Sequence, residues 1–116
     1  MDNQKSIQKI YYELKEKMAS WEDVSFNAKR HYVSVLRGSK VKIYLILQKS
    51  QIKIDMIRRV DFSGDVQSVP IRFTLDDPKN LFSLSVNEYK EVYTCSVTEN
   101  SGLDYLLMVM KQKFDS

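Results

Sequence analysis

Residues 31–56 read HYVSVLRGSKVKIYLILQKSQIKIDM, and this stretch decides the fold class. Three runs within it alternate between apolar and other side chains: 31–36, 40–47 and 51–56. The polar segments Arg37–Ser39 and Gln48–Ser50 separate the runs. A period of two is typical of β-strands, and short polar connections join antiparallel neighbours. The stretch therefore predicts a three-stranded antiparallel meander.

The alternation also assigns side chains to the two faces of this meander, because successive residues of a strand point to opposite sides. The apolar set is expected to face the core: Val33, Val35, Val41, Ile43, Leu45, Ile52, Ile54 and Met56. The other set is expected to face away from it: Lys40, Lys42, Tyr44, Gln51, Lys53 and Asp55.

Two amphipathic helices are predicted on either side of the meander, because apolar residues recur there at helical spacing. The first stripe holds Ile7, Ile10, Tyr11, Leu14 and Met18, with Trp21 closing the helix against the core. The second stripe holds Leu103, Leu106, Leu107, Met110 and Phe114. Ser101 and Asp104 resemble a capping box at the start of the second helix.

The segment between the meander and the second helix has mixed signals. We predict a loop over 61–69, a short edge strand over 70–75, core contacts from Leu81, Phe82, Leu84 and Val86, and a last strand over 91–97. The predicted fold class is α+β: one antiparallel sheet, the three-strand meander plus later strands, with the N- and C-terminal helices packed on one face.

Length and composition favour a single soluble domain over residues 1–116, in the cytoplasm. The lone Cys95 excludes an intrachain disulfide and points to a reducing compartment. The longest apolar run, Ile43–Leu47, is far shorter than the ~18 residues of a membrane span. The first residues are polar, unlike a signal peptide. We therefore expect no membrane association.

Charge is unevenly distributed along the chain. Residues 1–60 carry 13 basic and 6 acidic side chains, whereas residues 61–116 carry 5 and 9. Nine of the basic residues lie between Lys29 and Arg59, with Asp55 as the one acidic residue among them. Such an imbalance can steer an oppositely charged partner. The sequence thus predicts a basic sheet face.

That face is the candidate binding site, and Lys40, Lys42, Tyr44 and Lys53 are its predicted nucleic-acid-binding residues. Lysines contact phosphates, and Tyr44, with Tyr32 and Tyr93, can stack on bases as in single-strand binders. Three alternatives stay open: a solvated face that blunts edge-to-edge aggregation, an acidic protein partner, and a homodimer formed through the sheet or its edge.

Signals for catalysis are weak, so we predict a non-enzymatic module with no catalytic residue, no metal and no cofactor. One histidine, His31, and one cysteine, Cys95, do not make a zinc site. Asp76 or Asp77 followed by Glu88-Tyr89-Lys90 resembles an acidic residue with E-x-K, which holds Mg²⁺ in nucleases. A small metal-dependent nuclease is therefore the third and weakest hypothesis.

Short segments spread over about residues 7–114 resemble an uncharacterised bacterial and archaeal domain family catalogued as "predicted transport protein". They are Lys29-Arg-His-Tyr-Val-Ser-Val35, Gln48-Lys-Ser-Gln-Ile-Lys-Ile54, Leu75-Asp-Asp-Pro-Lys-Asn80, and Leu103-Asp-Tyr-Leu-Leu107 with Met110-Lys-Gln112. The family often has a "ghwGng" segment before the last strand, where this chain has Ser85–Glu91. Members commonly form the C-terminal domain of longer proteins, some resembling restriction or nuclease systems. The resemblance implies an accessory recognition module and brings no established activity.

Overall fold

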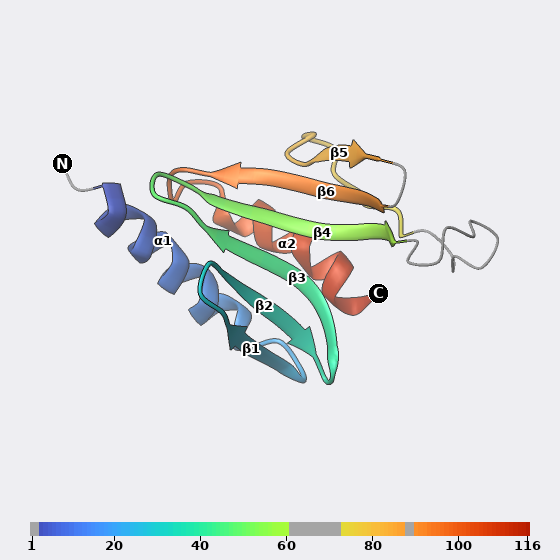
Figure 1. Ribbon diagram of the computed structural model, residues 1–116, viewed down its shortest axis with the longest axis horizontal. Coiled ribbons are helices and arrows are strands. Elements are labelled where there is room, and N and C mark those ends of the chain that lie inside the picture. Colours follow the sequence, from blue (N-terminus) through green and yellow to red (C-terminus); the bar gives the residue numbers. More distant parts are fainter. Residues whose placement is uncertain (1–2, 61–72, 88–89) are drawn as a thin grey trace.

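The computed structural model describes residues 3–60, 73–87 and 90–116. Within these ranges six strands form one antiparallel sheet in the order β1-β2-β3-β4-β6-β5, and two helices lie behind it in the view of Figure 1. The elements are α1 (Asn3–Met18), β1 (Val24–Ala28), β2 (Tyr32–Arg37), β3 (Lys40–Leu47), β4 (Ile52–Val60), β5 (Ser83–Val86), β6 (Lys90–Val97) and α2 (Leu103–Asp115).

This arrangement confirms the predicted α+β class and the meander, which is β2, β3 and β4. The sequence did not predict β1, which extends the sheet beyond β2. The described part of the predicted strand over 70–75, Phe73–Leu75, is not a strand, and the edge strand is β5 instead. The predicted loop over 61–69 and residues 70–72 lie outside the described residues.

One cluster of buried side chains fills the space between the sheet and both helices. Both predicted helical stripes contribute to it, as do the inward residues of the meander: Val33, Val35, Ile43, Leu45, Ile52, Ile54 and Met56. Trp21 packs against Phe114 with ring centroids 4.9 Å apart, so the end of α1 meets the end of α2. Both helices therefore cover one face of the sheet. We call the other the open face, because no helix of the described residues lies on it.

A β-bulge overturns the predicted inward position of Val41, which is 41% exposed. Val35 pairs with Ile43, but Leu36 pairs with Val41, so β3 has one more residue than β2 at this point. A bulge of this kind breaks the strict alternation of faces and bends its strand. The residues of β3 before Ile43 consequently do not follow the period of two that the sequence suggested.

The segment before β5 is held on α2 and β6 by hydrogen bonds. Main-chain N–H and carbonyl groups of Asp76 bond both ends of the Gln112 amide, at 2.8 and 2.7 Å. The Leu75 N–H donates to the Tyr93 hydroxyl at 3.3 Å, which places Tyr93 on the helix side of the sheet. Phe82 is buried as predicted, whereas Leu81, Leu84 and Val86 are 40%, 41% and 62% exposed, so the predicted core role of these three is wrong. Leu81 precedes β5, and Leu84 and Val86 sit on this short edge strand.

Candidate nucleic-acid interface

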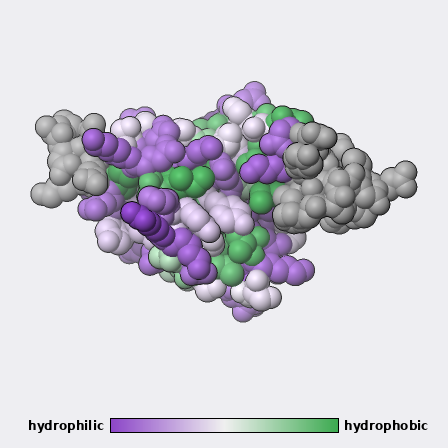
Figure 2. Space-filling model, in the orientation of Figure 1, coloured by the Kyte–Doolittle hydropathy of each residue, from purple (hydrophilic) through white to green (hydrophobic). Residues whose placement is uncertain are grey.

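Paired residues of neighbouring strands share a face, so the register defines rows of side chains across the open face. One row starts at Asn27 on β1 and continues across the five other strands with Ser34, Tyr44, Asp55, Thr94 and Ser83. The next row consists of Tyr32, Ile46, Lys53 and Ser96. Figure 2 shows this face toward the viewer, with weakly polar and hydrophobic side chains near its middle and strongly hydrophilic ones around them.

Two tyrosines of these rows lie together on β2 and β3. Tyr32 and Tyr44 project from adjacent strands, and their ring centroids are 5.9 Å apart in an edge-to-face arrangement. Such a pair is mutually stabilising, and its rings have two rotatable torsions each, so little freedom remains to be lost on binding. Tyr32 is 36% exposed. The pair therefore presents an ordered aromatic surface on the open face.

A hollow of about 290 Å³ lies beside this pair. Its lining comes from β2, β3, β4 and β6 and consists of Tyr32, Tyr44, Ile46, Asp55, Ile57, Lys90 and Val92. The Asp55 Oδ2 atom is 3.8 Å from the Lys53 ammonium. The Asp55 Oδ1 atom is buried and has no hydrogen-bond partner among the described residues. The hollow thus combines apolar walls, two aromatic rings, the Lys90 side chain and the carboxylate of Asp55, one oxygen of which is buried without a partner among the described residues.

Cations gather at the end of the open face nearest Tyr32. The β1–β2 and β3–β4 turns meet there, because the Leu47 N–H donates to the His31 carbonyl at 3.3 Å. We call this region the basic end and define it as Lys29, Arg30, Lys49 and Lys53. The first three are exposed turn residues, and Lys53 lies one row from Tyr44. The basic end therefore borders the aromatic pair.

The structure places two of the four residues predicted to bind nucleic acid on the open face and the other two near the end of α2. Tyr44 and Lys53 lie on the open face as expected. Lys42, at the bulge, instead donates to the Ser116 carbonyl at 2.6 Å, at the end of α2 on the helix side. Arg37 likewise donates to the Asp115 carbonyl at 2.9 Å. The last carbonyls of a helix carry partial negative charge, so these cations stabilise the end of α2.

Lys40 lies near Lys42 and Arg37, the two cations at the end of α2. Burial lowers the pKa of Lys42 below its usual range, and the nearby charges of Lys40 and Arg37 lower it further. Burial also lowers the pKa of Lys113 on α2, with a further contribution from the charge of Lys42. The four cations therefore crowd around the end of α2. The predicted three-lysine sheet face does not form, because the bulge turns Lys42 toward the helix.

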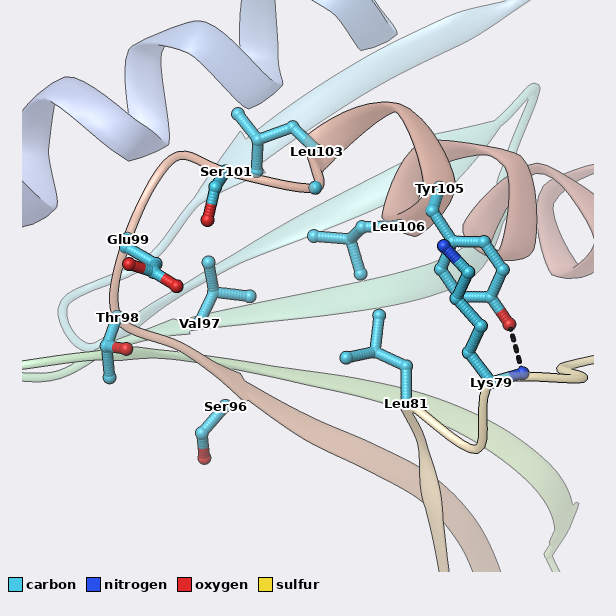
Figure 3. Close-up of a pocket in the computed structure, with 11 residues that line it drawn as sticks. Lys79, Leu81, Ser96, Val97, Thr98, Glu99, Ser101, Leu103, Tyr105 and Leu106 are labelled. Carbon is cyan, nitrogen blue, oxygen red and sulfur yellow. Dashed lines mark hydrogen bonds between the residues drawn. The ribbon is translucent and has the colours of Figure 1, made fainter.

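A second hollow of about 290 Å³ lies at the start of α2 (Figure 3). Leu81, Val97 and Leu106 point toward one another across it, and the Lys79 ammonium lies 4.8 Å from the Tyr105 ring centroid. Gly102 occupies the N-cap position in a left-handed conformation without a side-chain cap, so the predicted capping box of Ser101 and Asp104 does not form. This hollow is a gap between the Leu81 segment and α2.

Asp77 fastens that segment to α2 and is not available for metal chemistry. Its Oδ1 accepts from the Tyr105 hydroxyl and its Oδ2 from the Phe82 N–H at 2.7 Å. The Tyr105 hydroxyl in turn accepts from the Lys79 N–H at 3.0 Å. Burial acts to raise the pKa of Asp77, but these hydrogen bonds, with one from the Leu81 N–H, outweigh it and leave the pKa below its usual value.

We expect the lowered pKa of Asp77 to make the fold less stable at acid pH. A carboxylate with a lowered folded-state pKa stabilises the fold above its unfolded pKa of about 3.9, and this contribution is lost as pH falls through the folded value. The Asp77→Asn variant should therefore be less stable than wild type at about pH 6 by about 1 kcal/mol, allowing for partial exposure, and the gap should be smaller at about pH 3, below the unfolded pKa. Urea unfolding at both pH values measures it. Asp76→Asn is the matched control, since Gln112 bonds its main chain; a gap independent of pH would contradict the assignment.

The remaining sequence candidates do not form a catalytic group among the described residues. Burial, with smaller contributions from the charges of Asp77 and Asp55, raises the pKa of the Cys95 thiol to about 12, so the thiol stays protonated. His31 is exposed in the β1–β2 turn. Glu88 and Tyr89 of the nuclease-like pattern lie outside the described residues. In the part of the chain that the structure covers, no three His, Cys, Asp or Glu side chains cluster as metal ligands would.

No family model matches the chain, and no curated protein or solved structure matches it either. The resemblance described above therefore stays a prediction. Among the helices described, neither is long and apolar enough to cross a membrane. The argument for function consequently depends on the geometry of the open face.

Proposed function

We propose that this chain is a non-enzymatic recognition module that binds single-stranded nucleic acid across its open face. The observation that carries the proposal is the Tyr32–Tyr44 pair on the open face, where the described residues place no helix. Bases stack on aromatic rings at about 1–3 kcal/mol per base, with little dependence on sequence. The basic end supplies cations for the phosphates that follow a stacked base. Single strands are favoured over duplexes because their bases are free to stack.

Salt dependence separates this function from a merely solvated face. With about three phosphate contacts, log Kd should change with log salt by a slope of about 2, so affinity should fall more than tenfold between about 50 and 200 mM salt. Fluorescence anisotropy with labelled single-stranded DNA and RNA measures this slope. No binding to any single strand at low salt would overturn the proposal.

Two lysine variants locate the interface. We expect Lys53→Gln to weaken binding and to reduce the salt slope by about 0.7, the value for one lost contact to a single strand. Lys42→Gln is the matched control, because Lys42 is bonded to the Ser116 carbonyl at the end of α2. Its affinity should equal that of wild type. The reverse outcome would move the interface to the helix side.

A second candidate function, a protein-interaction or dimerisation domain, has its own supporting observation. The sheet order ends at β5, whose Leu84 and Val86 side chains are exposed. An edge strand of this kind can pair with a strand of a second copy or of another protein. Light scattering on the same sample tests this candidate: a concentration-dependent dimer that Val86→Lys abolishes would favour it over the open face.

A further inference from the structure

We infer that Asp55 gives the open face a preference for guanine. This inference rests on the proposed function, because it assigns a base to the hollow beside the tyrosine pair. It goes beyond that function, because stacking alone discriminates little among bases. The structural basis is the environment of one carboxylate.

Asp55 is in an unusual position for a carboxylate. It lies in the row that starts at Asn27, directly opposite Tyr44 on β3 and Thr94 on β6. Its side chain is 20% exposed, and Oδ1 is buried without a hydrogen-bond partner among the described residues. Buried polar atoms are nearly always bonded, and leaving one without a partner is costly. The Asp55 carboxylate would therefore be stabilised by a ligand that donates a hydrogen bond to it.

The walls of the hollow limit what that ligand can be. Tyr32 and Tyr44 offer ring surfaces, and Ile46, Ile57 and Val92 offer apolar ones, with Asp55 and Lys90 as the charged residues of the lining. A flat, aromatic group with donors on one edge satisfies all of these surfaces together. Nucleobases have this form, and proteins that bind single strands read the Watson–Crick edge of a stacked base.

Among the four bases, guanine fits a carboxylate best. Its Watson–Crick edge carries two adjacent donors, the ring N1–H and the exocyclic amino group, and a carboxylate offers two acceptor oxygens. Adenine and cytosine place one amino group beside a ring acceptor, which would face the second carboxylate oxygen. Uracil and thymine present one imino donor between two carbonyls. Guanine can therefore donate two hydrogen bonds to the carboxylate, whereas each of the other bases places an acceptor against one carboxylate oxygen.

Lys53 complements this arrangement without reading the base. Its ammonium lies 3.8 Å from Asp55 Oδ2 and keeps the carboxylate charge partly balanced while the hollow is empty. The Lys53 side chain is 40% exposed, so it remains open to a phosphate. Asp55 then supplies specificity and Lys53 supplies affinity that does not depend on sequence.

The test uses short single-stranded oligonucleotides that differ only at the central base and are otherwise uracil, or thymine in the DNA series. A well-formed two-bond pair discriminates by about 1–3 kcal/mol, so the guanine oligonucleotide should bind at least about tenfold more tightly than the others. Replacing guanine by inosine removes only the exocyclic amino group and should erase most of this preference. The inosine comparison uses wild-type protein, so it does not depend on how any variant folds.

Two variants complete the test. Asp55→Asn keeps the shape but replaces one acceptor by a donor, and it should abolish the guanine preference. Lys53→Gln should weaken binding to every oligonucleotide equally and keep the preference. Equal binding of all central bases, or a guanine preference unchanged in Asp55→Asn, would overturn the inference while leaving stacking on the tyrosines intact. Absence of binding to all oligonucleotides would instead overturn the proposed function.

Discussion

The Tyr32→Ala/Tyr44→Ala double variant is expected to bind single-stranded nucleic acid at least about 30-fold more weakly than wild type. Two stacking contacts at the low end of about 1–3 kcal/mol each amount to about 2 kcal/mol, which corresponds to that factor. The loss should be similar for every sequence, because a ring stacks on any base. Anisotropy titrations with uniform and mixed oligonucleotides measure it.

A tyrosine elsewhere on the chain provides the matched control for this variant. Tyr12 lies on α1 and is 63% exposed, so Tyr12→Ala removes an aromatic surface away from the open face. Its affinity should equal that of wild type. Tyr32→Phe and Tyr44→Phe keep the rings and should retain most of the affinity. A loss below threefold in the double variant, with the fold verified by urea unfolding, would show that the rings are not the stacking surface.

The largest effect on stability is expected from Phe114→Ala, which should lower the free energy of unfolding by about 3–5 kcal/mol. Phe114 is 1% exposed at the end of α2 and packs against Trp21 from the segment after α1. Its removal opens a cavity where the two helices meet the sheet. Domains of this size are stable by only about 5–15 kcal/mol, so the variant could lose a large part of the total.

Urea unfolding measures this loss, with Met108→Ala as the control on the same helix. Met108 is 53% exposed, and its truncation should change stability by less than about 0.5 kcal/mol. Phe114→Leu should fall between wild type and Phe114→Ala, which keeps the comparison measurable if the alanine variant does not fold. A loss below about 1 kcal/mol for Phe114→Ala would mean that α2 is held mainly by its other contacts.

The periodicity of apolar residues was sufficient to predict the helices and strands in which one whole face is buried. Both helices and the three meander strands repeat their apolar residues with the period of their structure, so burial alone places them. β1 escaped prediction although its run, Val24–Ala28, alternates between apolar and polar residues, because the run is only five residues long and Phe26 is its one aromatic residue. β5 escaped because a four-residue edge strand has no buried side to mark it. Such strands form because a neighbouring strand offers unpaired main-chain groups.

The candidate site was predicted in part. Tyr44 and Lys53 followed from alternation. Tyr32 and Tyr93 were named as stacking residues, and only Tyr32 lies on the open face, because Tyr93 is paired with the buried Met56. Lys40 and Lys42 were misplaced because the bulge between β2 and β3 leaves no mark that alternation can detect. Asp55 was assigned to the correct face, but its importance could not be predicted. A carboxylate without a donor becomes visible only when the neighbours on β3 and β6 are placed around it.

The row Asn27–Ser34–Tyr44–Asp55–Thr94–Ser83 has a thermodynamic consequence. Six strands each supply one of its residues, so the site exists only when the sheet is assembled, and the unfolded chain has no equivalent. A ligand that binds the folded state alone raises stability by RT ln(1 + [L]/Kd), which is about 2.7 kcal/mol at a ligand concentration of about 100 Kd. A melting-temperature screen therefore detects compounds that bind the folded protein, and these compounds need no fluorescent label.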